Sequence, residues 1–223
     1  MSLLKICVDR EGEFKWIDSS ELERLTGVKF LSDLKMQNEK IRQRIFRLGE
    51  KKSSTFLGRI WQNFRSLFDP PERGVDVEQL WRGQYYKDDI ESGKISDVFL
   101  RWISPSLGWG IFAARSFKPK EFIAEYTGVV RKWQKADWKN GYCFEYVYES
   151  GKPTSFVIDA REESGLARYI NHSEEGNLEP KLATLGSLTH VLLLTKRSIE
   201  KGEQLCYHYG PAYWARRSPP IPL

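Results

Sequence analysis

Cysteine is scarce in this sequence of 223 residues, and the spacing of the few cysteines excludes two kinds of site. Cys7, Cys143 and Cys206 stand far apart, and no C-x-x-C pair is present. A local tetrahedral zinc site needs clustered ligands, and a disulfide framework needs an even number of cysteines. We therefore expect no metal and no disulfide, and we expect a reducing compartment in which the thiols are small core side chains.

Long apolar runs are also missing, which argues against a membrane span. No run reaches the roughly 20 residues that a spanning helix requires. The first residues, MSLLKICVDREGEFKW, hold an apolar patch too short for a signal-peptide core and then become charged. We expect no cleaved secretion signal and a cytoplasmic location in the producing cell. Export without a cleaved signal stays open as an alternative.

The composition is otherwise that of a folded, mildly basic protein. Hydrophobic residues make up 40% of the chain and the net charge is +5, so the chain can bury a core and is not of a disordered type. The positive charge gathers in residues 35–68, where nine Lys and Arg stand against two Glu. Such a segment permits contact with nucleic acid without requiring it.

Residues 1–95 are expected to form a helical, basic N-terminal region. DSSELERL at 18–25 offers a helix cap and an acidic first turn. Spacings of three and four then connect Leu31, Leu34, Asn38, Ile41, Ile45 and Leu48. This seam predicts a helix packed on its own domain, with a homodimer through the seam as the alternative. Residues 56–68 predict a second amphipathic helix, which packs on the domain or lies on a membrane surface.

The hydrophobic pattern of the sequence changes after the helix-breaking stretch DPPERG at 69–74. A short helix over 76–86 is expected next. From about residue 97 the period becomes two, in short runs rich in β-branched and aromatic residues. We therefore expect a mainly β domain over 96–216, with a brief helical turn near 163–170 and a Pro-rich tail at 217–223. The whole chain would be α+β.

Four polar stretches interrupt the expected strands, and each has an ordinary structural interpretation when taken alone. They are SLGWGIFAA (106–114), EYTGVV (125–130), RYINHSEEGN (168–177) and GEQLCYHYGPAYW (202–214). In this order, and with YCFEYVYESGKPTSFVIDA (142–160) between the second and third, they resemble the motifs of SET-domain protein lysine methyltransferases. The resemblance runs from about Val98 to Trp214, roughly half of the chain.

The resemblance implies a fold and a cofactor. The fold is the SET fold, with several short sheets and a knot-like crossing where the N-H-S segment meets the C-terminal tyrosine motif. The cofactor is S-adenosyl-L-methionine, whose zwitterionic end supplies partners to a buried polar segment. The cofactor-binding residues that it implies are Gly108, Trp109, Gly110, Arg168, Asn171, His172, Tyr209 and Trp214, with Asn177 satisfying loop backbone.

The resemblance also implies transfer of a methyl group to an uncharged lysine amine, with Tyr209, Tyr126, Tyr142 and Tyr207 as catalytic residues. Tyr209 would orient the reacting groups, and Tyr126 and Tyr142 would form channel walls. The family varies between Phe and Tyr at the position of Tyr207. A Tyr there implies mainly monomethylation.

The sequence departs from the family pattern at two places. His208 replaces the usual Asp of the D-Y-G motif, and no zinc-binding cysteine cluster follows the domain. PAYWARR at 211–217 is then the available lid, with Tyr213 and Trp214 expected beside the adenine. This compact form resembles the small SET proteins of intracellular bacteria, the chlamydial ones included, which implies a bacterial effector that could act in a host nucleus.

The expected substrate is a lysine-rich protein: a histone, a bacterial histone-like protein, or the chain itself. Acidic side chains in the second half would face a basic peptide, unless they are ordinary solvated surface: Glu125, Glu145, Glu149, Glu162, Glu163, Glu174 and Glu175. The alternative function is a non-catalytic SET-like module that binds nucleic acid or a protein partner through the basic helices.

Overall fold

A computed structural model describes residues 5–47, 77–149, 152–215 and 217. The amphipathic helix expected at 56–68, the breaker at 69–74 and nearly all of the expected Pro-rich tail lie outside these residues. Within the part described, no helix is long and apolar enough to cross a membrane. The described chain is mainly strand with fewer helices, which confirms the predicted fold class.

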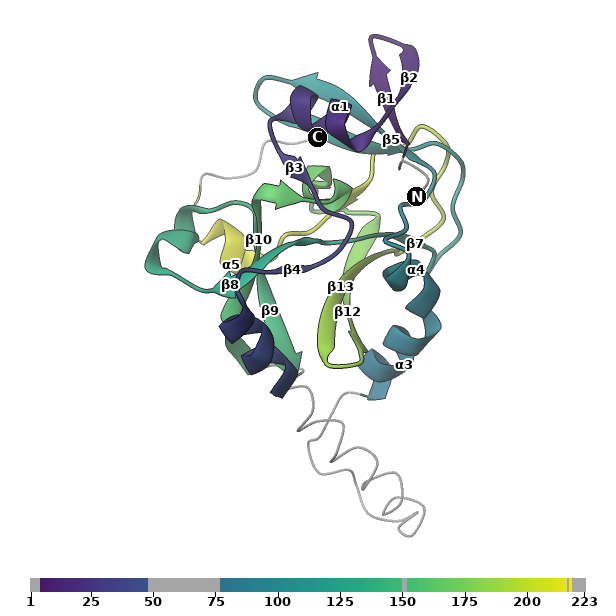
Figure 1. Ribbon diagram of the computed structural model, residues 1–223. Coiled ribbons are helices and arrows are strands. Elements are labelled where there is room, and N and C mark those ends of the chain that lie inside the picture. The colour runs from purple at the N-terminus through teal and green to yellow at the C-terminus, as the bar shows by residue number, and fades with distance from the viewer. Residues whose placement is uncertain (1–4, 48–76, 150–151, 216, 218–223) are drawn as a thin grey trace, which may run out of the picture.

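The strands form three sheets (Figure 1). The first has the order β2-β1-β5-β6, from Glu13–Ile17, Ile6–Arg10, Val98–Ser104 and Gly108–Ala113. The second has the order β3-β10-β8-β4, from Lys29–Phe30, Lys152–Ser164, Gly128–Lys132 and Lys35–Met36, with β9 (Cys143–Glu149) also paired to β10. The third has the order β11-β14-β12-β13-β7, from Asn171–His172, Cys206–Tyr207, Leu178–Leu185, Leu188–Thr195 and Phe122–Glu125.

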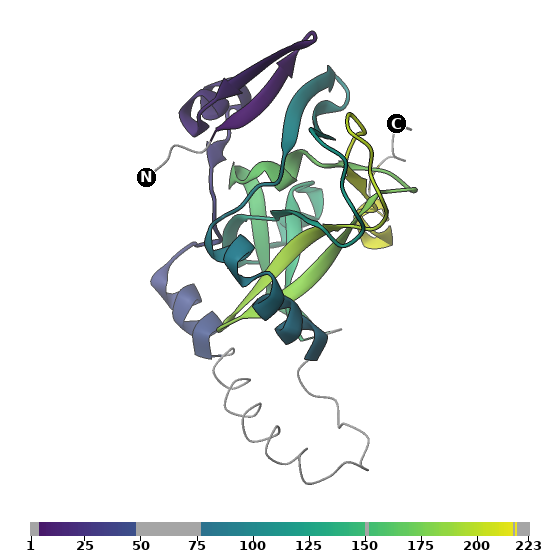
Figure 2. The same cartoon turned by 90° about the vertical axis from the view of Figure 1, so that its right-hand side faces the viewer.

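Short helices cover the sheets and join them. They are α1 (Ser19–Thr26), α3 (Val77–Tyr85), α4 (Lys87–Glu91) and α5 (Pro211–Trp214), with 3₁₀ turns at Lys135–Lys139 and Leu166–Tyr169. Residues 39–47 are also helical. The helix α3 lies along β12 (Figure 2), where Gly83 allows a close approach. A Cβ at Gly83 would overlap the carbonyl oxygen of Thr184.

The expectation of a helical N-terminal region is wrong for much of residues 5–36, which contain four strands and one helix. Residues 6–17 form the β1–β2 hairpin, which extends the first sheet because β1 pairs in parallel with β5. The helix α1 ends at Gly27, whose left-handed φ of 72° stops the helical hydrogen-bond pattern. The chain then adds β3 to β10 and β4 to β8. These edge pairings satisfy the backbone and outweigh the local helical pattern.

The heptad seam consequently does not exist as one helix face. Leu31 and Leu34 lie outside any helix, Ile41 and Ile45 lie in the helical segment 39–47, and Leu48 lies outside the described residues. Leu34, Ile41 and Ile45 nevertheless pack on the main hydrophobic core. The described part of the seam therefore packs on its own domain. The homodimer was predicted from one continuous helix, and residues 31–47 do not form one.

The cysteines are free, and two of them are core side chains as expected. Cys7 and Cys206 are buried, whereas Cys143 is only partly so. Burial raises the pKa of the Cys206 thiol to about 12. This thiol therefore stays protonated and unreactive at neutral pH.

Candidate active site

A cavity of about 560 Å³ lies where β6, the 166–172 segment and α5 meet. Its volume falls within the range of small-molecule sites, which is roughly 300–1,000 Å³. Seven of the eight predicted cofactor-binding residues line it: Gly108, Trp109, Arg168, Asn171, His172, Tyr209 and Trp214. The eighth, Gly110, does not line the cavity but adjoins Asn171, since a Cβ at Gly110 would stand 3.2 Å from the Asn171 Nδ2.

A second and much narrower cavity, of about 40 Å³, shares a wall with the first. All four predicted catalytic tyrosines line this narrow cavity: Tyr126, Tyr142, Tyr207 and Tyr209. Tyr142, Arg168, Tyr209 and Tyr213 line both cavities. The arrangement suits one bulky ligand in the wide cavity and one slender side chain in the narrow one.

The N-H-S segment is brought to the C-terminal motif by strand pairing. β11 and β14 run in parallel, with Asn171 opposite Cys206 and His172 opposite Tyr207. Asn177 fixes this crossing, because its Oδ1 accepts the Cys206 N–H at 2.9 Å and its Nδ2 donates to the Gln204 carbonyl at 2.8 Å. The predicted backbone-satisfying role of Asn177 is confirmed.

His172 is buried and contacts the C-terminal aromatic residues. Its Nδ1 accepts the Tyr209 N–H at 3.1 Å, and its ring centroid lies 4.8 Å from that of Trp214. Asn171 donates from Nδ2 to the Trp109 carbonyl at 3.2 Å. These bonds join three of the recognised motifs around the wide cavity.

The loop that carries Tyr142 is hydrogen-bonded to the strand β10 through Asn140. Asn140 accepts the Tyr142 N–H at 3.0 Å and donates to Asp159 at 2.8 Å. Asp159 is also paired with Arg131 at 2.7 Å. Asp159 of β10 therefore positions Tyr142, the predicted channel-wall residue, through Asn140.

Two tyrosine hydroxyls in the narrow cavity donate hydrogen bonds to backbone carbonyls. The Tyr209 hydroxyl donates to the Ile170 carbonyl at 2.8 Å, and the Tyr126 hydroxyl donates to the Tyr142 carbonyl at 3.0 Å. Burial raises the pKa of Tyr126, Tyr207 and Tyr209 well above the usual value for tyrosine. These phenols stay neutral at physiological pH and cannot act as bases there.

We expect the melting temperature to fall as the pH rises above about 10, the ordinary pKa of tyrosine. The unfolded chain then loses phenol protons that the folded chain keeps on Tyr126, Tyr207 and Tyr209. The unfolded state binds fewer protons, so stability decreases with rising pH. Thermal unfolding followed by circular dichroism should show a shallower alkaline decrease in Tyr126→Phe. Identical slopes in the two proteins would contradict the assignment of Tyr126 as a buried neutral phenol.

Two buried donors at the cavities have no hydrogen-bond partner within the described chain: Arg168 Nε and Trp214 Nε1. Arg168 stacks its guanidinium 4.1 Å from the Tyr142 ring centroid, between the two cavities. A buried donor without a partner costs free energy. Both donors would be satisfied by acceptor atoms of a bound polar ligand, so the site fits a polar cofactor.

Tyr213 and Trp214, the expected lid residues, both line the wide cavity. The Trp214 ring lies parallel to the Tyr209 ring, 6.3 Å away with an interplanar angle of 7°. Tyr213 packs edge-on against Tyr209 at 4.8 Å and lines both cavities.

Several lining residues were not predicted. Thr26 is the last residue of α1 and Val28 follows the helix, and Ser106, Leu107, Gly141 and Tyr169 complete the wall. Ser106, Leu107 and Tyr169 lie inside the quoted stretches and Gly141 directly precedes one, so the motifs could have indicated them. Nothing in the local pattern links Thr26 and Val28 to lining residues that begin at Ser106, far along the sequence.

Two of the acidic residues expected to face a substrate are engaged elsewhere. Glu125 is buried and bonded to His190 at 2.8 Å, and Glu163 is paired with Lys35 at 2.7 Å. Glu125 therefore belongs neither to a substrate-facing surface nor to ordinary solvated surface, and Glu163 is a partly buried ion-pair partner. Glu145, Glu162, Glu174 and Glu175 are exposed, and the side chain of Glu149 lies outside the described part.

Comparison with known proteins matches residues 108–210 to the SET domain family. The chain is 35% identical over 130 residues to the Xenopus laevis N-lysine methyltransferase KMT5A-A, covering 54% of this chain and 38% of that protein. It is 38% identical over 112 residues to the Drosophila melanogaster histone-lysine N-methyltransferase Set8, covering 46% and 16% respectively. A humanized mutant of the Chaetomium thermophilum Polycomb Repressive Complex 2 aligns with a TM-score of 0.47 and 28% identity, over 54% of this chain and 16% of that one. The chain thus spans well under half the length of these relatives.

Proposed function

From the premise that the chain contains a SET domain over residues 108–210, we propose that it is an S-adenosyl-L-methionine-dependent protein-lysine N-methyltransferase. The observation that carries the proposal is the pair of cavities with Tyr142, Arg168, Tyr209 and Tyr213 in their common wall. A reaction that joins a bulky donor to the tip of a slender side chain needs two such compartments meeting at one point.

The wide cavity would hold the cofactor, which supplies an activated methyl group when bound. Trp109, Asn171, His172 and Trp214 would contact it, and the unpaired donors on Arg168 and Trp214 would meet its acceptors. Gly108 adopts a φ of 70°, a conformation that glycine adopts without strain, next to Trp109.

The narrow cavity would hold the substrate lysine. Its aromatic walls disfavour the charged ammonium form and so lower the pKa of the lysine amine. The uncharged amine is therefore favoured in this cavity. The tyrosines keep their protons, because burial raises their pKa. Tyr209 and Tyr126 would therefore orient the amine and stabilise charge, and the amine would lose its proton to water before transfer.

We include in the proposal a basic protein substrate, such as a histone or a bacterial histone-like protein. The exposed Glu145, Glu162 and Glu175 support it, because acidic side chains attract a lysine-rich segment. The place of action, either the cytoplasm of the producing cell or a host nucleus, stays a prediction.

We also propose that the enzyme adds mainly one methyl group. Tyr207 is 6% exposed and lines the narrow cavity, where its bulk and hydroxyl limit room for a methylated amine. Tyr207→Phe should raise the dimethyl and trimethyl share several-fold, measured by mass spectrometry of the product. Tyr86→Phe, at a buried tyrosine in a separate core cluster, is the control. An unchanged product distribution in Tyr207→Phe would overturn this part of the proposal.

The whole proposal is tested by titrating S-adenosyl-L-methionine into the protein and by assaying labelled methyl transfer. Core histones, a lysine-rich bacterial histone-like protein and the chain alone are the acceptors, and label on lysine is the expected result. Cofactor binding without transfer would leave the cofactor site standing and exclude these substrates. Absence of both, together with DNA binding that falls steeply with salt, would support the non-catalytic module instead.

A further inference from the structure

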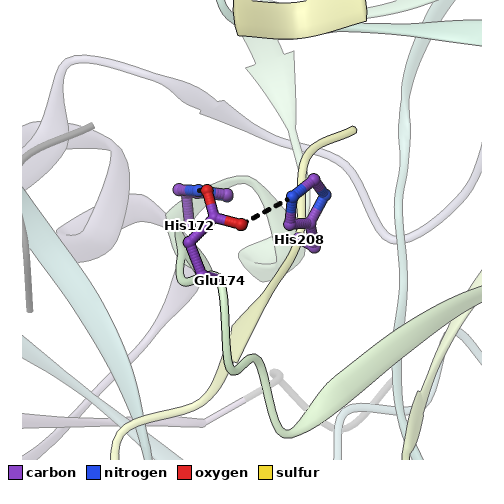
Figure 3. A group of neighbouring side chains, drawn as sticks. All are labelled: His172, Glu174 and His208. Carbon is purple, nitrogen blue, oxygen red and sulfur yellow. Dashed lines mark hydrogen bonds and ion pairs between the residues drawn. The ribbon is translucent and has the colours of Figure 1, made fainter. Parts of the chain in front are cut away.

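Three side chains beside the wide cavity meet around one carboxylate: His172, Glu174 and His208 (Figure 3). Glu174 Oε1 lies 3.3 Å from His172 Nε2, and its Oε2 lies 3.0 Å from His208 Nε2. Each carboxylate oxygen therefore serves a different imidazole. The two rings stand 5.0 Å apart with an interplanar angle of 69°.

The opposite nitrogen of each imidazole has a backbone partner. His172 Nδ1 accepts the Tyr209 N–H at 3.1 Å, and His208 Nδ1 accepts the Gly210 N–H at 2.9 Å. A ring nitrogen that accepts a hydrogen bond carries no proton. The neutral form of each histidine therefore has its proton on Nε2, and both Nε2–H groups donate to Glu174.

The same three groups also resemble a metal-binding donor set, because their ligand atoms lie within 4.8 Å of one another. A metal would take the Nε2 lone pair and would leave the imidazole proton on Nδ1. That proton would then oppose the backbone N–H of Tyr209 or Gly210. The backbone donors thus favour a carboxylate bridge over a metal site.

The bridge holds the part of the chain that carries the predicted reaction tyrosine. His172 and His208 bind the N–H groups of Tyr209 and Gly210. Gly210, with a φ of 94°, starts the turn into α5 and its lid residues. The His172 ring also packs against the rings of Tyr209 and Trp214, at centroid distances of 5.3 and 4.8 Å.

We propose that Glu174 is a positioning residue for methyl transfer, acting through the two histidines. By accepting both Nε2–H groups, it fixes the tautomers that leave Nδ1 free to hold the backbone of Tyr209 and Gly210. His208 stands where the resembling motif has Asp, so this second imidazole is a departure from that motif. The inference rests on the proposed function, since the consequence is the placement of the Tyr209 hydroxyl.

The test compares Glu174→Gln with Glu174→Asp and with the control Glu179→Gln. An amide offers one acceptor and one donor, so Gln can satisfy only one of the two Nε2–H groups. We expect kcat for methylation of core histones to fall about tenfold in Glu174→Gln, with KM for the cofactor changed much less. Glu174→Asp should recover part of the loss. Glu179, which pairs with Lys181 at 2.9 Å on β12, should tolerate Gln with kcat unchanged.

Nitrogen-15 spectra of the imidazoles test the geometry independently of activity. The chain has only three histidines, so single substitutions assign each signal. Both His172 and His208 should show the Nε2–H tautomer, and one of them should change in Glu174→Gln. Full kcat in Glu174→Gln, an Nδ1–H tautomer in the parent, or retention of one equivalent of added Zn²⁺ would each overturn the inference. If the parent methylates nothing but the tautomers are as stated, the failure belongs to the proposed function.

Discussion

We expect Tyr209→Phe to lower the proposed methyl transfer to lysine about 100-fold or more, the typical cost of removing one well-placed donor from a reaction centre. The Tyr209 hydroxyl is held by the Ile170 carbonyl at 2.8 Å, and its ring forms part of the wall between the two cavities. Removal of the hydroxyl leaves the ring packing intact. The loss should therefore be found in kcat, with little change in cofactor affinity or melting temperature.

The matched control for this variant is Tyr86→Phe. Tyr86 is also buried, and its hydroxyl also donates to a backbone carbonyl, that of Lys120 at 2.7 Å. It belongs to the smaller core cluster with Ile90 and Phe122, away from both cavities. Single-turnover assays with labelled cofactor should show normal transfer in Tyr86→Phe. Equal rates in the parent and Tyr209→Phe would remove Tyr209 from the reaction centre.

Gly176→Ala destabilises the protein by about 3 kcal/mol, at the upper end of typical overpacking costs. A Cβ at this position would lie 2.7 Å from the Tyr207 Cα and 2.9 Å from the Cys206 carbonyl oxygen. Both are backbone atoms of β14 and cannot turn aside as a side chain can. Relief of the overlap has to separate the turn that carries Gly176 from β14, and His172 and Tyr209 adjoin these two segments. We therefore expect weaker cofactor binding as well.

Thermal unfolding and cofactor titration measure the two consequences of Gly176→Ala. A loss of this size lowers the melting temperature by roughly 10 °C in a chain of this length. Gly186→Ala is the control, because Gly186 has a φ of 58° but no atom within 4 Å of its Cβ position. It should cost only the strain of a left-handed residue, about 1 kcal/mol. Similar losses in both variants would show that close approach at Gly176 is not the reason.

The residues of the candidate site could be predicted far better than the N-terminal architecture. Asn171, His172 and Tyr209 lie in short motifs whose order and spacing are distinctive, and the structure gathers them around one cavity. These residues come together because β11 pairs with β14. The order of the motifs implies this pairing, whereas local strand propensity does not. The prediction of a mainly β domain succeeded because period-two patterns mark half-buried strands.

The N-terminal part was mispredicted because its local pattern and its tertiary contacts disagree. Residues 29–36 carry apolar residues at helical spacing, yet β3 and β4 complete the edges of the second sheet. Parallel pairing with strands more than 90 residues away leaves no local signal. For the same reason Thr26 and Val28 could not be assigned to the cavity wall, and the pairing of Glu174 with both histidines could not be read from their spacing.

The position of β14 has a consequence for the order in which the chain matures during synthesis. This strand is placed between β11 and β12 in the third sheet, although it follows both in the sequence. Until residues 206–207 have left the ribosome, β11 has no neighbour and Asn177 lacks the partners on Gln204 and Cys206. Long-range closure of this kind is slow compared with local helix formation. A nascent chain therefore completes the crossing of β11 and β14, and with it the candidate cofactor site, only after residue 207 has left the ribosome.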